Sequence, residues 1–380
     1  MKRLLILLLW VLSSTLSVTM AQDDALEQES FLLTFVPNIQ FAPIYVAQEA
    51  GFFEQAGFDV SLQYLDEPDV VDLVASGESN FGVVSGEQVI LATAQGRPIT
   101  YVYEWFQQFP IGIMYDDQLD VVTVADLLAM DPRVGIPGRF GATYSGFIAL
   151  LQSYDLDVSD VRLDEIGFAA SEVFCLGAVD ASVIYLNNEP LQVNNRAEQG
   201  DCGAVNGVNV LPIAETIDLV SNGIITNQVL IDEQPERVRA FVGAYDAGLA
   251  LTIDNPARAY LLSASAIPDF TIPEDLENAL TILADEQDAF LGTNPDREAI
   301  ATSRAEQFTM LSEQFDAGTL LQFQVLLRSI ELWEADQLGY TDADSWLNMR
   351  DTLVSLGQLD ADFDLAAIYT NDFLPVNDNE

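Results

Sequence analysis

Amide and aromatic side chains gather directly after a predicted strand near the start of the chain. Asn38 and Gln40 follow the strand predicted at Leu32–Val36, and Phe41 and Tyr45 come shortly after them. An amide group can donate and accept hydrogen bonds, and an aromatic ring offers a flat apolar face. This combination favours the binding of a planar ligand with polar edges.

Four other predicted strands are also followed by an aromatic side chain, an amide side chain, or both. The residues concerned are Ser85, Glu87, Trp105, Gln107, Phe140, Tyr144, Tyr185, Asn187 and Glu189. Each alone has a simpler explanation, because rings near strand ends often fill a core, and Asn38 or Ser85 can serve as turn or cap residues. Their recurrence favours one shared cleft, since ligands of open α/β sheets bind beyond the carboxyl ends of the strands. Each ring that stacks on a flat ligand would contribute roughly 0.5–1.5 kcal/mol beyond area burial.

Composition excludes several classes of function. The chain of 380 residues has 60 acidic and 14 basic residues, a formal net charge of −46 and no histidine. Such acidity repels nucleic acid and anionic membranes, so we expect neither as a partner. The absence of histidine removes Ser-His-Asp and Cys-His nucleophiles and histidine metal sites. At 49% hydrophobic residues the chain can form packed cores, and its length predicts more than one of them.

An exported enzyme would have to use carboxylate pairs as acid and base. The chain offers Asp66 with Glu67 and Asp164 with Glu165, each next to a predicted strand. We interpret both pairs as solvated surface charge. The sequence therefore predicts a binding protein that is not an enzyme and holds no cofactor or metal.

The first 21 residues have the layout of a secretory signal peptide. Lys2 and Arg3 precede an apolar run, Leu4–Leu12, and small residues follow up to Ala21. The run is too short for a permanent transmembrane helix, which needs about 20 apolar residues. We predict an exported protein, located in the periplasm or at the cell surface.

Two cysteines remain in the exported chain, Cys175 and Cys202. In an oxidising compartment they can form a disulfide that stabilises the fold by roughly 3 kcal/mol. The alternative is a pair of buried free thiols.

Short apolar runs alternate with amphipathic segments, a pattern typical of mainly parallel α/β sheets. The predicted strands are Leu32–Val36, Val60–Tyr64, Phe81–Val84, Ile99–Tyr103, Ile111–Tyr115, Arg133–Ile136, Val161–Ile166, Ala181–Tyr185 and Val208–Leu211. The predicted helices among them are Pro43–Ala56, Asp69–Ser76, Glu87–Gln95, Gly141–Tyr154 and Ala169–Leu176. Beyond Ile225 the helical spacing of apolar residues predicts Glu236–Thr252, Glu274–Phe290, Arg297–Phe315 and Gly318–Asp336.

This order predicts two α/β lobes, with the second inserted into the first and a helical C-terminal half. Residues 31–114 and 214–375 would form lobe 1, and residues 115–213 would form lobe 2. The chain would cross between the lobes near Tyr115 and Ile213, which we expect to act as hinges.

Nearly the whole exported chain resembles the substrate-binding proteins of ABC importers that are related to thiamine-pyrimidine synthase. The matching segments are Pro37–Asn38, Ala42–Ala47, Gly51–Phe53, Ser85–Gln88, Gly177–Ala181, Tyr185 with Glu189, and Tyr369–Leu374. The resemblance implies the two-lobe type II periplasmic-binding-protein fold, a monomer and an ABC transporter permease as partner. In the pyrimidine-binding members an aromatic residue and a glutamate one helical turn apart hold the aminopyrimidine, and Tyr185 and Glu189 match that pair.

Two departures from the family pattern bear on function. Phe41 stands where the family often has histidine, and the cysteine-rich stretch of the synthase is missing, so the chemistry of the synthase is not expected. The segments around Phe41, Glu87 and Trp105 are similar to those of the riboflavin-binding receptors. The resemblance therefore implies riboflavin as the transported ligand. The alternatives are a thiamine-precursor pyrimidine of the formylaminopyrimidine type, or a sulfonate or other anion, for which Arg139 is the obvious cationic candidate.

Overall fold

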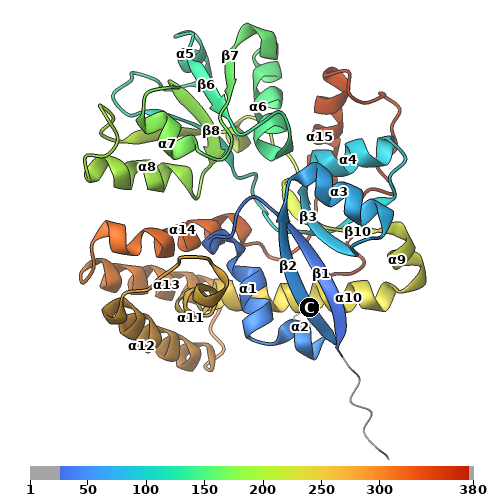
Figure 1. Cartoon of the computed structure of the whole chain (residues 1–380), viewed down its shortest axis with the longest axis vertical. Coiled ribbons are helices and arrows are strands. Elements are labelled where there is room, and N and C mark those ends of the chain that lie inside the picture. Colours follow the sequence, from blue (N-terminus) through green and yellow to red (C-terminus); the bar gives the residue numbers. More distant parts are fainter. Residues whose placement is uncertain (1–25, 376–380) are drawn as a thin grey trace, which may run out of the picture.

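The computed structural model describes residues 26–375, which form two five-stranded sheets covered by helices (Figure 1). The predicted signal peptide, residues 1–21, lies outside the described residues. Within residues 26–375, none of the helices is both long and apolar enough to span a bilayer.

Sheet 1 has the strand order β2-β1-β3-β10-β4. Its strands are β1 Glu27–Thr34, β2 Phe58–Leu65, β3 Phe81–Ser85, β4 Ile99–Glu104 and β10 Asn222–Asn227. β3, β4 and β10 are buried along their whole length. For β3 and β10 this is expected of central strands covered on both faces, whereas the edge strand β4 is covered by bridges from Tyr101 to Tyr369 and from Glu104 to Gly339.

Sheet 2 has the strand order β7-β6-β8-β5-β9. Its strands are β5 Ile111–Asp116, β6 Arg133–Ile136, β7 Arg162–Glu165, β8 Ala181–Tyr185 and β9 Val208–Pro212. The two sheets are thus built alike.

One strand in each sheet runs against the others. β10 is antiparallel to β3 and β4, and β5 is antiparallel to β8 and β9. The neighbours of β1 and of β6 pair parallel. The expected mainly parallel arrangement therefore holds with one exception in each sheet. The exception is the strand with which the chain enters that sheet after crossing from the other one, β5 in sheet 2 and β10 in sheet 1.

Helices on one face of sheet 1 form the larger core. They are α1 Ala42–Glu49, α2 Phe52–Gln55, α9 Gln228–Glu233, α10 Pro235–Asp254, α11 Pro256–Ser263, α12 Glu274–Leu291, α13 Arg297–Ser312 and α14 Ala317–Trp333. Phe241 of α10 lies at the centre, where its ring stacks on Phe81 of β3 with 3.8 Å between centroids. The predicted helical C-terminal half thus packs on the first sheet.

A second core lies between the two sheets, and a third covers the far side of sheet 2. Helices α3 Glu67–Ser76, α4 Gly86–Ala94, α5 Val124–Leu128, α6 Gly141–Ser153 and α15 Ala343–Ser355 contribute to the second core. Helices α7 Ala170–Cys175 and α8 Glu189–Glu198 contribute to the third. Because the second core contains residues of both sheets, the two lobes pack against each other in this structure (Figure 1).

Several predicted boundaries differ from the structure. The helix predicted at Pro43–Ala56 is two helices, because Gly51 between them adopts a φ of 76° that ends the first. α14 ends at Trp333 rather than Asp336, since Glu334 is extended. Helix α8 and strand β10 were not predicted.

The chain crosses between the sheets at residues 105–110 and again at residues 213–221. The predicted crossing near Ile213 coincides with the second segment. The first crossing was predicted too late, since Tyr115 pairs within β5 with Ala181 and Asn209 of sheet 2.

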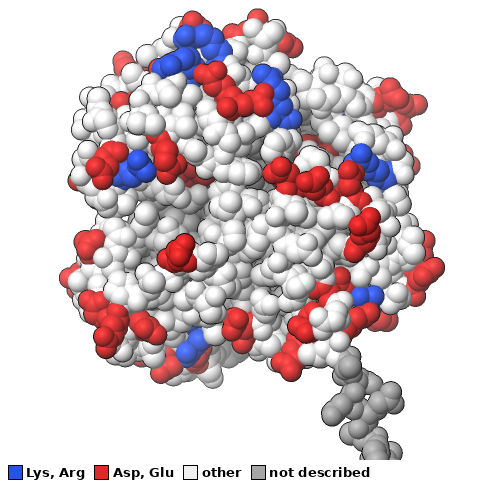
Figure 2. Space-filling view, in the orientation of Figure 1, with Lys and Arg blue, Asp and Glu red and all other residues white. Residues whose placement is uncertain are grey.

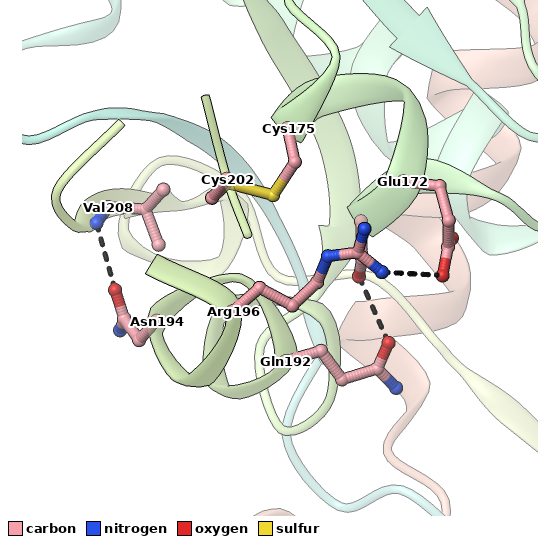
Figure 3. The surroundings of a disulfide bond; sticks show 8 residues. Glu172, Cys175, Gln192, Asn194, Arg196, Cys202 and Val208 are labelled. Atoms are coloured by element: carbon pink, nitrogen blue, oxygen red, sulfur yellow. Dashed lines mark hydrogen bonds and ion pairs between the residues drawn. A yellow bond between two sulfur atoms is a disulfide. The ribbon is translucent and has the colours of Figure 1, made fainter. Parts of the chain in front are cut away.

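Cys175 and Cys202 form a disulfide that links the end of α7 to the segment after α8 (Figure 3). Of the two alternatives for these cysteines, the structure has the bonded one. Arg196 of α8 donates to Glu172 of α7 at 3.3 Å, so α7 is linked both to α8 and to the segment that follows it.

Acidic side chains outnumber basic ones on the face that Figure 2 shows. Every arginine among residues 26–375 lies within 4.0 Å of a carboxylate, as in the pair of Arg237 with Glu29 at 2.7 Å. The described part of the chain therefore presents no unpaired cation.

Candidate functional site

A cavity that is open to solvent lies between the two lobes at the carboxyl ends of the strands. Residues at or just after six strands line it, namely Thr34, Leu65, Val83, Trp105, Pro137 and Tyr185. This is the position that the sequence analysis expected for a shared cleft.

Aromatic rings form one wall of the cavity. Trp105 lies 5.6 Å from Phe41 and 5.2 Å from Phe106, measured between ring centroids, and it stacks on Trp333 at 5.7 Å. Its buried indole nitrogen has no hydrogen-bond partner within residues 26–375. The wall therefore offers a flat apolar surface.

Two further rings meet across the mouth. Phe35 follows β1 of lobe 1 and Phe168 follows β7 of lobe 2, and their centroids are 4.8 Å apart in an edge-to-face arrangement. Phe35 has a φ of 70°, which is rare for a bulky residue and costs on the order of 1–3 kcal/mol. This backbone conformation aims the ring at the other lobe.

The floor of the cavity is a polar network centred on Glu67, the first residue of α3. The Ser85 hydroxyl lies 2.6 Å from Glu67 Oε2 and 2.6 Å from Glu87 Oε1. Asn222 donates to Glu67 Oε1 at 3.4 Å and accepts from the Tyr185 hydroxyl at 2.8 Å. The network joins elements of both lobes.

Burial raises the pKa values of the titratable side chains in this floor. It raises the pKa of Glu67 to about 8, with the nearby Glu87 adding to the rise, and it also raises the pKa of Glu87. The pKa of Tyr185 lies well above its ordinary value, mainly because of burial. Tyr185 therefore keeps its proton and serves as a donor.

Glu189 lies at the start of α8 and also lines the cavity. Its Oε2 accepts from the Tyr185 backbone N–H at 3.1 Å, and its Oε1 accepts from the Asn188 side chain at 3.2 Å. Burial raises the pKa of Glu189 to about 7.

The predicted site residues divide into two groups. Gln40, Phe41, Trp105, Phe140, Tyr185 and Glu189 line the cavity together. Asn38, Tyr45, Ser85, Glu87, Gln107, Tyr144 and Asn187 do not line it.

Most residues of the second group support the site from outside. Asn38 accepts from the Gln40 backbone N–H at 2.8 Å and so caps the short 3-10 helix Ile39–Phe41. Tyr45 is fully buried, with its hydroxyl 2.6 Å from that of Tyr64. Gln107 donates to the Glu104 carbonyl at 2.8 Å. For Asn38 and Tyr45 these are the cap and core roles named above as alternatives.

Asn187 connects the lobes directly. Its side-chain nitrogen donates to Gln40 Oε1 at 2.8 Å and to the Ser329 hydroxyl of α14 at 2.6 Å. Asn187 is 1% exposed and follows β8 of lobe 2, whereas both acceptors belong to lobe 1. These two hydrogen bonds require the lobes to be close together.

The interpretation of Asp66 and Glu67 as solvated charge was wrong for Glu67, which is buried and lines the cavity. Gly141, at the start of α6 in lobe 2, explains the burial. A Cβ at Gly141 would lie 3.3 Å from Glu67 Oε1, and its φ is 74°, so glycine lets this backbone cover the carboxyl. Asp66 is exposed, as are Asp164 and Glu165.

The lining residues that were not predicted include three aromatic residues and one amide, namely Phe35, Phe106, Phe168 and Asn222. Phe106 stands between the predicted residues Trp105 and Gln107, and Phe35 lies at the end of the predicted strand Leu32–Val36, so these positions could have identified both. Asn222 belongs to the strand β10 that was not predicted.

Arg139 does not line the cavity. It donates to Glu165 at 2.9 Å and lies 6.0 Å from the Tyr144 ring centroid. Among residues 26–375 the charged side chains that line the cavity are all acidic, namely Asp66, Glu67 and Glu189.

Comparison with known proteins agrees with this architecture. A family model described as "NMT1/THI5 like" matches residues 38–259. Riboflavin-binding protein RibY of Chloroflexus aurantiacus is 31% identical, over 93% of this chain and 88% of that protein. A formylaminopyrimidine-binding protein of Halalkalibacterium halodurans is 27% identical, over 75% of this chain and 85% of that protein.

Solved structures show the same fold. A Candida albicans protein described as having the generic periplasmic binding protein fold superposes with a TM-score of 0.55 at 14% identity, covering 93% of this chain and 99% of that chain. The predicted two-lobe periplasmic-binding-protein fold is thereby confirmed.

Proposed function

Because the chain belongs to the NMT1/THI5-like family, we propose that it is an exported solute-binding receptor that captures riboflavin or a related flavin for an ABC importer. The observation that carries this proposal is the cavity between the lobes, which combines an aromatic wall with a floor of neutral and acidic groups. The similarity to a riboflavin-binding protein over nearly the whole chain supports the choice of ligand.

The chemistry of the cavity lining suits a flavin. The rings of Phe41, Trp105 and Phe106 offer apolar faces to a tricyclic ligand. Asn222 and Glu67 offer hydrogen bonds to its polar edge.

An anion suits the cavity poorly. Its charged lining residues within the described chain are acidic, and Arg139 is engaged with Glu165 outside it. A sulfonate or nitrate would therefore meet repulsion without a compensating cation.

Capture would proceed by closure of the two lobes around the segments 105–110 and 213–221. The bonds of Asn187 to Gln40 and Ser329, and the contact of Phe35 with Phe168, form only when the lobes meet. They would favour the closed state after the ligand enters.

The test is titration of the purified mature protein with riboflavin, followed by flavin fluorescence and calorimetry. We expect saturable quenching at micromolar ligand or below, with one ligand per chain. Protein in which Phe41 and Phe106 are both replaced by alanine should lose at least tenfold in affinity. Absence of quenching by intact, folded protein would remove flavin as the ligand.

A thiamine-precursor aminopyrimidine is the second candidate, because Tyr185 and Glu189 lie side by side in the lining. Both carboxylate oxygens of Glu189 are already engaged with Tyr185 and Asn188, which leaves less capacity for ligand donors. Titration with an aminopyrimidine under the same conditions separates the two candidates.

We also propose a receptor role without catalysis, because the chain contains no histidine that could act as an acid or base. We propose that the ligand leaves the cavity chemically unchanged, which chromatography of the released ligand can verify.

A further inference from the structure

We propose that Glu67, Ser85 and Glu87 form a proton-binding site between the lobes, and that the receptor takes up one proton there each time it closes on its ligand. The inference rests on the proposed function, because it concerns closure of the lobes around a flavin. It makes the proton a second ligand of the receptor, held by side chains at the floor of the cavity.

The contacts of Ser85 require one proton in addition to the hydrogen of its own hydroxyl group. That hydroxyl lies 2.6 Å from Glu67 Oε2 and 2.6 Å from Glu87 Oε1. A hydroxyl has one hydrogen and donates it to one acceptor, so the other contact needs a carboxylic acid that donates to the serine oxygen. The two carboxyl groups of the closed receptor therefore hold one proton and one negative charge between them.

Both carboxyl groups come from lobe 1, and lobe 2 covers them. Glu67 begins α3 and Glu87 lies in the first turn of α4, and they are 7% and 3% exposed. From lobe 2 the backbone of Gly141 lies over Glu67, because a Cβ at this glycine would be 3.3 Å from Oε1. Tyr185 of lobe 2 donates to Asn222, which donates to the same Oε1. Opening of the lobes would remove this cover and let water reach the carboxyl groups.

No cation offsets the two carboxyl groups. Among residues 26–375 no arginine lies within 4.0 Å of either of them. Arg139 lines a neighbouring hollow together with Glu87, but its guanidinium group pairs with Glu165 at 2.9 Å. Two buried negative charges without a cation are costly, and a bound proton removes one of them.

The other titratable side chains around the site do not supply a positive charge. They are Asp66 of α3, Glu189 of α8, Tyr185 of β8 and Tyr144 of α6. The neutral polar side chains are Gln88 of α4, Asn222 of β10 and Ser145 of α6. Burial raises the pKa of Tyr185 well above its usual value, so this phenol stays neutral. A proton from solvent is therefore the charge that closure can recruit.

Proton uptake on closure makes ligand binding depend on pH. With the lobes apart, water solvates both carboxylates, whereas in the closed receptor burial and the charge of Glu87 raise the pKa of Glu67 from 4.5 to about 8. Between these values the open receptor has released a proton that the closed receptor holds. Ligand affinity should therefore fall as pH rises through this range, by up to about tenfold per pH unit, and level off outside it.

Isothermal calorimetry of the full mature chain with riboflavin measures the proton directly. Titrations at pH 6.5 in buffers of different ionisation enthalpy give the number of protons taken up per ligand, because the buffer releases each proton that the protein binds. Riboflavin does not itself titrate near this pH. We expect an uptake of about 0.5–1 proton per ligand, and an affinity that falls about 3–10-fold per pH unit between about pH 5.5 and pH 7.5.

Glu87→Gln removes the need for the proton without changing the cavity lining, because Glu87 does not line the cavity. The amide N–H of the new side chain can donate to the serine oxygen in place of the acid O–H, so the site keeps its hydrogens and its single negative charge. This variant should bind riboflavin without proton uptake and with a flat pH profile. Its affinity should match that of the parent at about pH 5.5 to within about threefold.

Two other carboxyl groups provide controls. Asp246 accepts from the Tyr103 hydroxyl at 2.8 Å within lobe 1 and does not line the cavity, and burial raises its pKa to about 6. Glu189 is the carboxyl group that lobe 2 contributes to the lining. Asp246→Asn and Glu189→Gln should both retain the parental proton uptake per bound ligand. Circular dichroism and thermal unfolding establish that each variant is folded.

Each outcome bears on a different claim. Riboflavin binding with no proton uptake and a flat pH profile would overturn the proton site and leave the receptor proposal standing. Uptake that persists in Glu87→Gln, or that disappears in Glu189→Gln, would assign the proton to another group and would also overturn it. Failure of riboflavin to bind at any pH would refute the proposed function and the inference with it.

Discussion

Replacing Asn187 by alanine should weaken ligand binding while leaving the separate lobes intact. The side-chain nitrogen makes two hydrogen bonds across the lobes, to Gln40 at 2.8 Å and to Ser329 at 2.6 Å. Each contributes about 0.5–1.5 kcal/mol net, so the closed state should lose about 2 kcal/mol. Since a tenfold change corresponds to about 1.4 kcal/mol, affinity should fall about 30-fold.

Asn255 provides a matched control for this loss. It is fully buried, and its side-chain nitrogen also donates twice, to the Ala284 carbonyl at 2.9 Å and to Asp288 at 2.7 Å. Both partners lie within the helices of lobe 1. Asn255→Ala should therefore lower the unfolding temperature without changing affinity for riboflavin.

Isothermal calorimetry and thermal unfolding of the two variants and the parent decide the matter. If Asn187→Ala binds as tightly as the parent, its bonds do not stabilise a ligand-closed state. If both variants lose affinity in proportion to their lost stability, general destabilisation explains the result, and our assignment of Asn187 to lobe closure is refuted.

Three other predictions concern the wall, the disulfide and pH. Trp105→Ala should cost about 3–5 kcal/mol of unfolding free energy, because Trp105 is 3% exposed, and urea titration measures it; a loss below about 1 kcal/mol would contradict its burial. Replacing Cys175 and Cys202 together by alanine should lower stability by about 2–4 kcal/mol, and an unchanged urea midpoint would argue against the bond. Burial raises the pKa of Glu104 from 4.5 to about 8, so its contribution to stability is complete below pH 4.5 and disappears as pH rises through about 8. Glu104→Gln should therefore flatten the decline of unfolding free energy between pH 5 and pH 9, and an identical slope would refute this.

Local sequence patterns predicted the strand ends and many of the residues beside them. Phe41, Trp105 and Tyr185 were expected at one cleft, and they line one cavity. The reason is that an apolar run fixes where a strand stops, and the topology of an α/β sheet brings those ends to one edge.

Burial by the opposite lobe could not be predicted in the same way. Glu67 stands next to Asp66 in a sequence that suggests an exposed turn, yet Gly141, far along the chain, covers it. Tyr45 shows the reverse case, because the rotation of α1 about its axis turns its ring into the core. Neither the burial of Glu67 nor that of Tyr45 is determined by the residues adjacent to it in the sequence.

The insertion of β10 between β3 and β4 has a consequence for how the chain acquires its structure. All five strands of sheet 2 come from the continuous stretch 111–212, so this half can pair completely as soon as that stretch is available. β3 and β4, by contrast, do not pair with each other. Both pair with β10, which lies more than a hundred residues later in the chain. Pairings of such sequence separation form slowly. Sheet 2 begins later in the chain than sheet 1 but should complete its strand pairing first. Until β10 is available, the unpaired edges of β3 and β4 are the part of the nascent chain most exposed to misassociation.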